Sequence, residues 1–417
     1  MAAYCGLFNG YSKMAMKQTQ TKMFEFSDVG LDFCAGSKNL FPDRFKKMLA
    51  LGYNTQTVSS VAVTGKQVVL TYGVNHGYVA DRVLKLNATN LNGEYVIDSV
   101  TSNTVTLTID NAPSTVSGGF TTFIAPFGMQ LVYEQANIHI YKMKALDDSE
   151  YFFRIVFQSV LNQRNRIGVS IGKTADLVTG KITDINAHQD YAALNTASAP
   201  FALEFGGTAS ATANDFTYTQ GFATYGKWVV IGSPYHFIMS GRIGVSAYGN
   251  RFNAILPVFN IGYTSLNSHV AIGEISSQAL TSPNTGDGQN ERARGAAYIG
   301  KYKVALREFG LADYSDQILG MTNNAISSFL PESIDTFNTS TAKNIYVYDI
   351  GTAQNLGVVS GGAYVVHCNI SNAPPKDSLP ALISEIDSNS KIYLCGMAGN
   401  GGNNNYFATP IEEIKIV

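Results

Sequence analysis

The chain has 417 residues and a net charge of −2, which is enough length for two or three domains and too even a charge for a nucleic-acid-binding surface. Only 14% of the residues are charged, and Asn, Thr, Ser and Gly take their place alongside 23 Tyr and 23 Phe. This composition favours a protein that is buried in an assembly, although an ordinary β-rich domain can have the same figures.

The sequence predicts neither a signal peptide nor a membrane span. The start, Met-Ala-Ala-Tyr-Cys-Gly, lacks a basic region followed by an apolar one, and no apolar run approaches the roughly 18 residues that a span needs. The four cysteines stand far apart, which predicts free thiols and a reducing compartment rather than a disulfide framework. These cysteines are Cys5, Cys34, Cys368 and Cys395.

Residues 1–38 show no hydrophobic period, so we expect an extended arm that is lent to a neighbouring subunit, with a frayed chain end as the alternative. The large apolar side chains that such an arm would lay on its neighbour are Met14, Met16, Met23, Phe24 and Phe26.

A short helix follows the arm. Pro42 suits a first helical turn, and Phe41, Phe45 and Met48 recur at the spacing of one helical face. Gly52 is placed to end this helix.

Residues 54–126, which we call the β-module, carry the clearest strand pattern. Val105, Leu107 and Ile109 alternate with threonines, as in a strand with one buried face. Asn92-Gly93 and Ser102-Asn103 supply turn residues that tolerate positive φ, so hairpins are expected between the strands.

Three pieces of the β-module resemble a module of virion structural proteins of tailed bacteriophages. They are Asn75-His76-Gly77, Leu91-Asn92-Gly93-x-Tyr95-Val96, and Ser102-Asn103-Thr104-Val105-Thr106-Leu107. The resemblance covers about 70 residues and implies a β-rich part of a capsid, tail or baseplate.

Strands are also predicted over most of the remaining chain. Pro257 interrupts the apolar run 252–261 and marks part of it as a sheet edge, and the polar stretch 195–219 is expected to be a loop or domain seam. A helix is expected around Leu379–Ile386, where Pro380 suits the first turn. Loops are expected at 281–290 and 399–405. The strands are predicted at 136–140, 151–160, 227–231, 235–239, 344–350, 363–368, 391–395 and 412–417.

Gly168-Val169-Ser170-Ile171-Gly172 matches the hydrolase pattern G-x-S-x-G, which holds a serine on a strained turn between a strand and a helix. The residues that follow are too short and too broken by Thr and Gly for that helix. Gly168 to Thr174 also resembles a phosphate loop, but it has three residues between its glycines where four are needed. We therefore interpret this stretch as a β-turn between strands.

The remaining candidates for chemistry also have structural interpretations. The six histidines show no metal-binding spacing, and we expect His76 to hydrogen-bond its own turn. His367 and Cys368 should lie on opposite faces of a strand, which disfavours a catalytic pair. Asp147-Asp148-Ser149-Glu150 could hold a cation but is more typical of a hairpin tip. Three tyrosines that could stack on sugars or line an interface are Tyr191, Tyr346 and Tyr348.

The fold expected from these patterns is mainly β, with several antiparallel sandwich or barrel-like units and a few short helices. The expected divisions are an arm and helix over 1–53, the β-module over 54–126, a strand region over 127–205 and a β-rich domain over 206–417. No catalytic, cofactor-binding or metal-binding residue is predicted, and we expect no enzymatic activity.

The resemblance implies a structural subunit of a tailed-phage virion, in the tail or baseplate, that is assembled in the host cytoplasm. Its expected partners are copies of itself, in a three-fold or six-fold ring, and other virion proteins, with neither nucleic acid nor a membrane span involved. The alternatives are a capsid decoration or collar protein, a glycan-recognising receptor-binding protein and, least favoured, a polysaccharide-degrading enzyme.

Overall fold

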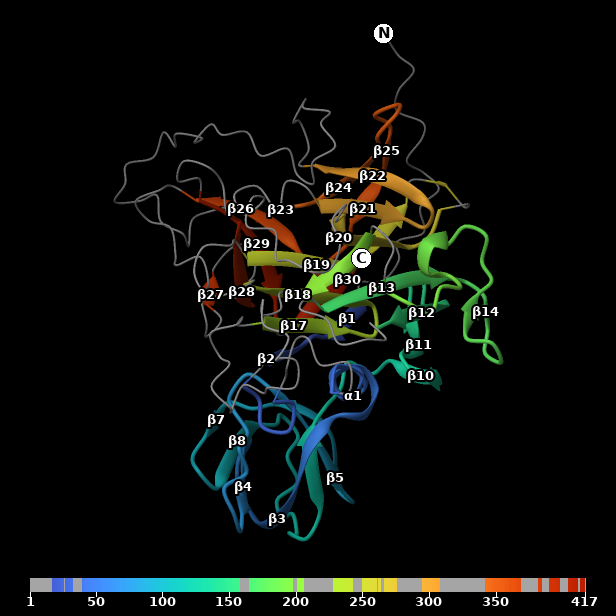
Figure 1. The fold of residues 1–417 in the computed structure, drawn as a ribbon. Helices are drawn as coiled ribbons and strands as arrows, with labels where there is room; N and C mark the ends of the chain where they lie inside the picture. Colours follow the sequence, from blue (N-terminus) through green and yellow to red (C-terminus); the bar gives the residue numbers. More distant parts are fainter. Residues whose placement is uncertain are drawn as a thin grey trace, which may run out of the picture.

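The computed structural model describes residues 17–25, 27–32, 40–157, 165–197, 201–205, 228–242, 250–260, 262–263, 266–275, 295–307, 342–368, 382–384, 390–397, 404–411 and 413–416. These residues form antiparallel sheets with very little helix, which confirms the fold class expected from the sequence (Figure 1). The apolar alternation along the strands places one face of each sheet in a core.

The largest sheet has fourteen strands, and part of it closes into a barrel. The ring β20-β21-β22-β24-β25-β19 is completed because β19 also pairs with β20. In sheet order the strands are β10 (Gln130–Gln135), β11 (Ile138–Lys144), β12 (Glu150–Val156), β13 (Asn165–Gly172), β16 (Phe201–Phe205), β20 (His269–Ile275), β21 (Gly295–Ile299), β22 (Tyr302–Arg307), β24 (Tyr346–Asp349), β25 (Asn355–Val359), β19 (Asn250–Asn260), β18 (His236–Arg242), β17 (Trp228–Ser233) and β2 (Lys22–Glu25).

The barrel is filled by aliphatic side chains from alternate positions of its strands. All of them belong to one buried core cluster, so the interior is packed. Members of this cluster include Ala254, Leu256, Val270, Ile272, Ala297, Ile299, Val304, Leu306 and Val347.

A five-stranded sheet packs against the barrel. The rings of Phe252 from β19 and Phe407 from β29 stack with centroids 4.0 Å apart. The strands of the five-stranded sheet, in sheet order, are β23 (Ala342–Lys343), β26 (Tyr364–Cys368), β29 (Asn404–Pro410), β28 (Ser390–Met397) and β27 (Leu382–Ser384).

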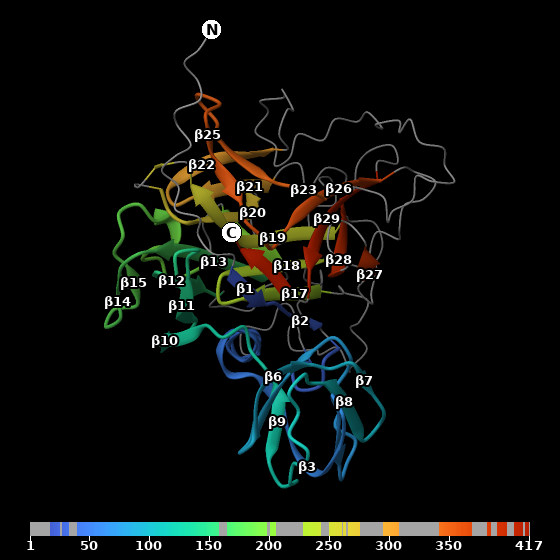
Figure 2. The same ribbon diagram turned by 180° about the vertical axis from the view of Figure 1, so that it is seen from behind.

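The β-module forms a seven-stranded sheet that projects from one end of the molecule in both views (Figures 1 and 2). Val105 and Leu107 are fully buried, as their alternation predicts. In sheet order its strands are β6 (Leu91–Val96), β5 (Val83–Ala88), β9 (Thr121–Ile124), β3 (Tyr53–Thr64), β4 (Gln67–Tyr72), β8 (Thr104–Thr108) and β7 (Ser99–Val100).

The helix predicted before the β-module is present as α1 (Phe41–Lys46), which continues as a π-helical turn, η1 (Lys47–Leu51). Phe41 and Phe45 are buried, and Gly52 ends the element with a φ of 78°. The shorter elements are the hairpin β14 (Ala175–Asp176) and β15 (Lys181–Ile182), the 3-10 turn η2 (Gln189–Tyr191), and the pair β1 (Lys17–Gln20) and β30 (Glu413–Ile416).

The structure corrects the expectation that Met23 and Phe24 lie on a neighbouring subunit. Strand β2 pairs with β17 of the same chain, and both side chains are buried there. The Phe24 ring stacks on Phe127 with centroids 4.9 Å apart. Lys22 forms a 2.9 Å ion pair with Glu94, so residues 22–25 join the large sheet to the β-module. Met14, Met16 and Phe26 lie outside the described residues.

Four further predictions made from the sequence were wrong. Residues 382–384 form strand β27 where a helix was expected, and residues 201–205 form β16 within the expected loop. Residues 165–172, expected to contain a turn, form the continuous strand β13. Strand β19 passes through Pro257 unbroken and has neighbours on both sides, so it is no sheet edge.

Several expectations cannot be compared with the structure. The loop expected at 281–290 lies outside the described residues, as do positions 399–403 of the loop expected near the end of the chain. No helix in the described ranges is both long enough and apolar enough to cross a membrane.

Candidate functional site

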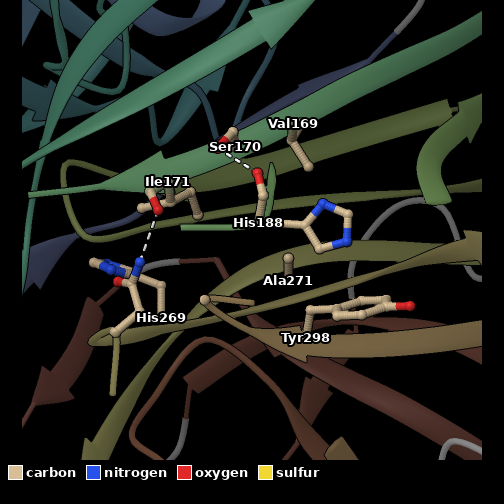
Figure 3. Close-up of a pocket in the computed structure, with 9 residues that line it drawn as sticks. Val169, Ser170, Ile171, His188, His269, Ala271 and Tyr298 are labelled. Carbon is tan, nitrogen blue, oxygen red and sulfur yellow. Dashed lines mark hydrogen bonds between the residues drawn. The ribbon is translucent and has the colours of Figure 1, made fainter. Parts of the chain in front are cut away.

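The residues singled out by the G-x-S-x-G pattern line a small pocket between β13 and the outer face of the barrel (Figure 3). Ser170 and its neighbours form one wall, while Ala271 of β20 and Tyr298 of β21 form the other. His188, which comes from the loop before η2, lies over the Tyr298 ring with centroids 4.5 Å apart. The volume open to the centre of a water molecule is about 10 Å³, which is room for about one water.

Ser170 does not have the geometry of a nucleophile. It lies within the regular strand β13, not on a turn that leads into a helix, and its side chain is 1% exposed. Its hydroxyl donates a 2.9 Å hydrogen bond to the main-chain oxygen of His188, not to the imidazole ring (Figure 3). An activated serine needs a base within hydrogen-bonding reach, and Ser170 instead ties the loop of His188 to the sheet.

The two glycines of the pattern are explained by packing. A Cβ on Gly168 would come within 2.3 Å of the Tyr191 ring, and one on Gly172 would come within 2.6 Å of the Ile182 side chain. The main-chain N–H of Lys173 donates to the Asp184 carboxylate at 2.8 Å. A phosphate loop needs free main-chain amides to bind its anion. The Lys173 amide is not available for this, because it already donates to Asp184.

The polar groups at the other end of the pocket connect the barrel to β13. The Asn267 side-chain amide donates to the Ile171 oxygen at 2.8 Å, and His269 lies beside it. Within the described part of the chain, Asn267 Oδ1 and His188 Nδ1 are buried without a hydrogen-bond partner. Burial lowers the pKa of His188, while Asp190 acts in the opposite direction. The pocket can therefore hold solvent, but its described lining residues do not pair a nucleophile with a base.

His76 hydrogen-bonds its own turn, as the sequence predicts. Its Nδ1 accepts the main-chain N–H of Tyr78 at 2.9 Å, and its Nε2 donates to the Thr104 oxygen at 3.1 Å. Gly77 beside it has a φ of 67°, a conformation that favours glycine. Burial lowers the pKa of His76. The turn Asn75–Gly77, which lies between β4 and β5 in the chain, is thus tied to the start of β8 by the His76 ring.

The acidic run Asp147–Glu150 is a hairpin tip. Asp147 accepts hydrogen bonds from the main-chain N–H and the hydroxyl of Ser149, and Asp148 has a φ of 65°. The Asp148 carboxylate also accepts the Tyr235 hydroxyl. These oxygens are used by protein donors, and the described residues contain no group of three or more His, Cys, Asp or Glu placed to hold a metal ion.

The tyrosines considered for sugar stacking are less exposed than expected. Tyr191 is fully buried against Gly168, which corrects its interpretation as a surface residue, and Tyr346 and Tyr348 are half-buried. Cys395 is fully buried. The side chains of His367 and Cys368 lie outside the described ones.

Two buried arginines were missed by the sequence reasoning. Arg154 donates to the main-chain oxygens of Gly180, Tyr191 and Leu194, and so holds the loop after β13 onto β12. Burial lowers the pKa of Arg154 to about 10. Its position in an alternating strand, between aromatic residues, was the only available signal.

Arg82 forms a two-bonded ion pair with Asp28, at 2.8 Å for each bond, and a further contact with Glu25 at 2.9 Å. Burial alone would lower the pKa of Arg82, but the two carboxylates raise it above its ordinary value. The Tyr53 hydroxyl donates to the same Asp28 at 2.7 Å. This cluster joins the β-module to the segment around β2, and no sequence spacing connects residues so far apart.

No protein-family model matches this chain, and no curated protein matches it in sequence.

Proposed function

We propose that the protein is a non-enzymatic structural subunit of a tailed-phage virion, in the tail or baseplate, that acts by self-assembly and by contacts with neighbouring virion proteins. The main support is the surface around the turn Asn75–Gly77. Val29, Val74 and Val79 are 53%, 62% and 41% exposed there, and the turn belongs to the motif that resembles phage proteins.

The exposed valines lie on a rigid support. A Cβ on Gly77 would come within 2.8 Å of Val29, so Val29 lies directly on the turn. The Asn54 side chain donates to the His76 oxygen at 2.8 Å and fixes the turn from behind. A preformed apolar surface loses little conformational entropy on binding, which suits a contact between subunits.

Two other features agree with a structural role. The low charge fraction limits repulsion between packed copies. The groups that could have supplied hydrolase, phosphate-binding or ion-binding chemistry are engaged in internal hydrogen bonds, as Ser170, Lys173 and Asp147 illustrate.

The test is the assembly state of the purified full-length chain, measured by analytical ultracentrifugation and electron microscopy. We expect three-fold or six-fold rings, and we expect Val74→Ser with Val79→Ser to weaken assembly at least tenfold without changing the circular dichroism spectrum. Val178→Ser is the matched control because Val178 is 88% exposed on a distant hairpin. A monomer at all concentrations, or turnover of host polysaccharide that is lost in Ser170→Ala, would contradict the proposal.

A further inference from the structure

The tip of the β11–β12 hairpin is fastened to the turn between β17 and β18. The main-chain N–H of Lys144 donates to the Pro234 oxygen at 2.8 Å, and the Tyr235 hydroxyl donates to Asp148. Leu146 packs on Tyr235 in a small apolar cluster of its own. These contacts, which we call the latch, connect the strand region to the sheet that continues into the barrel.

His269 supports the latch from the start of β20. Its Nε2 lies 3.2 Å from the Lys144 oxygen, and a carbonyl only accepts, so Nε2 carries the proton. Its Nδ1 then accepts the Ser268 hydroxyl at 2.8 Å. The ring is buried, and the edge contact with the Tyr151 ring, with centroids 5.4 Å apart, closes one side. The neutral imidazole is therefore the form that this site fits.

A second buried histidine lies at the same turn. His236 Nδ1 is 2.8 Å from the Ser233 hydroxyl, which also accepts the main-chain N–H of Tyr235. Among the described residues, His236 Nε2 has no partner. A proton added to either ring would place a charge in a buried site whose nearest polar groups are hydroxyls and main-chain oxygens, and such burial is costly.

We propose that the latch is released by acid, through protonation of His269. Asp147 and the main-chain oxygens of Lys144 and Tyr235 favour the charged ring, but burial outweighs them. The Asp148 carboxylate accepts the Tyr235 hydroxyl and lies 3.9 Å from the Lys144 ammonium, so its charge is already engaged. A protonated His236 would add repulsion. Opening the hairpin tip exposes His269 to water, which removes the cost of charging it.

The direction of the pH effect follows from the burial of His269. Burial lowers the pKa of His269 to about 4 in the latched state, whereas an exposed histidine has a pKa of about 6.5. The open state therefore binds more protons, and the latch, which is fully stable above pH 6.5, weakens as the pH falls towards 4. At pH 5 opening should be favoured about 20-fold relative to pH 7.

The amide of Lys144 is a direct probe because its N–H forms the latch. Hydrogen exchange of the full chain at pH 7 and pH 5, corrected for the intrinsic rates, should show protection at Lys144 falling about 20-fold. In His269→Gln, the amide side chain can still donate to the Lys144 oxygen but does not titrate, so most of this fall should disappear. His139→Gln is the matched control, since His139 is buried at the other end of β11 and should leave the fall intact.

The proposal would be overturned if protection of the Lys144 amide fell as much in His269→Gln as in the unmodified protein. It would also be overturned if this protection did not fall in the unmodified protein. If the variant does not fold, the unmodified chain provides a second measurement. The His269 ring and the Lys144 amide should titrate with the same midpoint by nuclear magnetic resonance, and separate midpoints would exclude His269 as the trigger.

Discussion

The barrel is a closed sheet, whereas the sheet of the β-module is open. In the barrel, main-chain pairing between β19 and β20 completes the ring, and the interior is aliphatic. The β-module also buries aliphatic side chains, such as Leu70 and Leu107, but it adds a buried network of polar and aromatic ones. The hydroxyls of Tyr72 and Tyr78 each lie 3.0 Å from the buried Thr122 hydroxyl, and the Tyr78 hydroxyl also donates to the Asn54 oxygen.

This difference indicates what each region depends on. A closed barrel satisfies its own edge strands and needs only dense packing. An open sheet of modest size relies on specific side-chain networks and on its neighbours. The buried pair Arg82–Asp28 supplies such a connection for the β-module, because Asp28 follows β2, which belongs to the large sheet. The predictions below separate these two forms of stabilisation.

The largest effect is expected in the barrel. Leu256→Ala removes a fully buried side chain from its interior and should cost about 2–5 kcal/mol of unfolding free energy. The fluorescence of Trp228, the only tryptophan, reports unfolding of the large sheet in guanidinium. The matched variant in the β-module is Leu107→Ala. If both variants shift the Trp228 transition equally, the two regions unfold as one unit and the distinction between them fails.

The second effect is expected at the connection. Asp28→Asn leaves Arg82 buried with only Glu25 beside it, and we expect a loss of about 3 kcal/mol. Hydrogen exchange should show weaker protection in the β-module and unchanged protection in the barrel. Asp110→Asn breaks an exposed ion pair with Lys66 and should change neither. Equal loss of protection in both regions would show that the pair stabilises the whole chain.

The smallest effect is expected inside the β-module. Thr122→Val keeps the volume but removes the hydroxyl that Tyr72 and Tyr78 share, and should cost about 1–2 kcal/mol in thermal unfolding. Burial raises the pKa of Tyr72 to about 12, so the phenol stays neutral throughout the usual pH range. Thr108→Val, at an exposed position of β8, is the control. If Thr122→Val lowered the stability no more than Thr108→Val does, the hydroxyl network would contribute nothing to the stability of the β-module.

The sequence predicted the half-buried strands better than the fully buried ones. In β8 the threonines that alternate with Val105 and Leu107 are less buried than these two residues, so the two-residue period is visible. Strands β17 and β18 were also predicted, at 227–231 and 235–239, because two apolar runs flank the turn residues Gly232-Ser233-Pro234. Strand β16 is only five residues long, and its pairing with β13 and β20 depends on residues distant in the chain.

Other errors arose where tertiary contacts override local preference. The apolar spacing of Leu382, Ile383 and Ile386 suits a helix, yet Leu382 pairs with Ile392 in a sheet. Pro257 lacks an N–H but lies opposite His269 of β20, near the point where β19 exchanges β18 for β25 as its neighbour on the other side. At the candidate site, the motif identified Ser170, whereas His188 and Asn267 reach it from loops without any local signal.

The pairing of β1 with β30 has a consequence for the order in which the chain folds. Lys17 lies opposite Ile416, so the first described strand finds its partner about 400 residues later. During synthesis β1 emerges early and must remain without that partner until the distant segment appears. Contacts of such long sequence separation form late because closing a long loop costs entropy. This two-stranded pair therefore belongs to the last events of maturation, after the barrel and the β-module can already have formed.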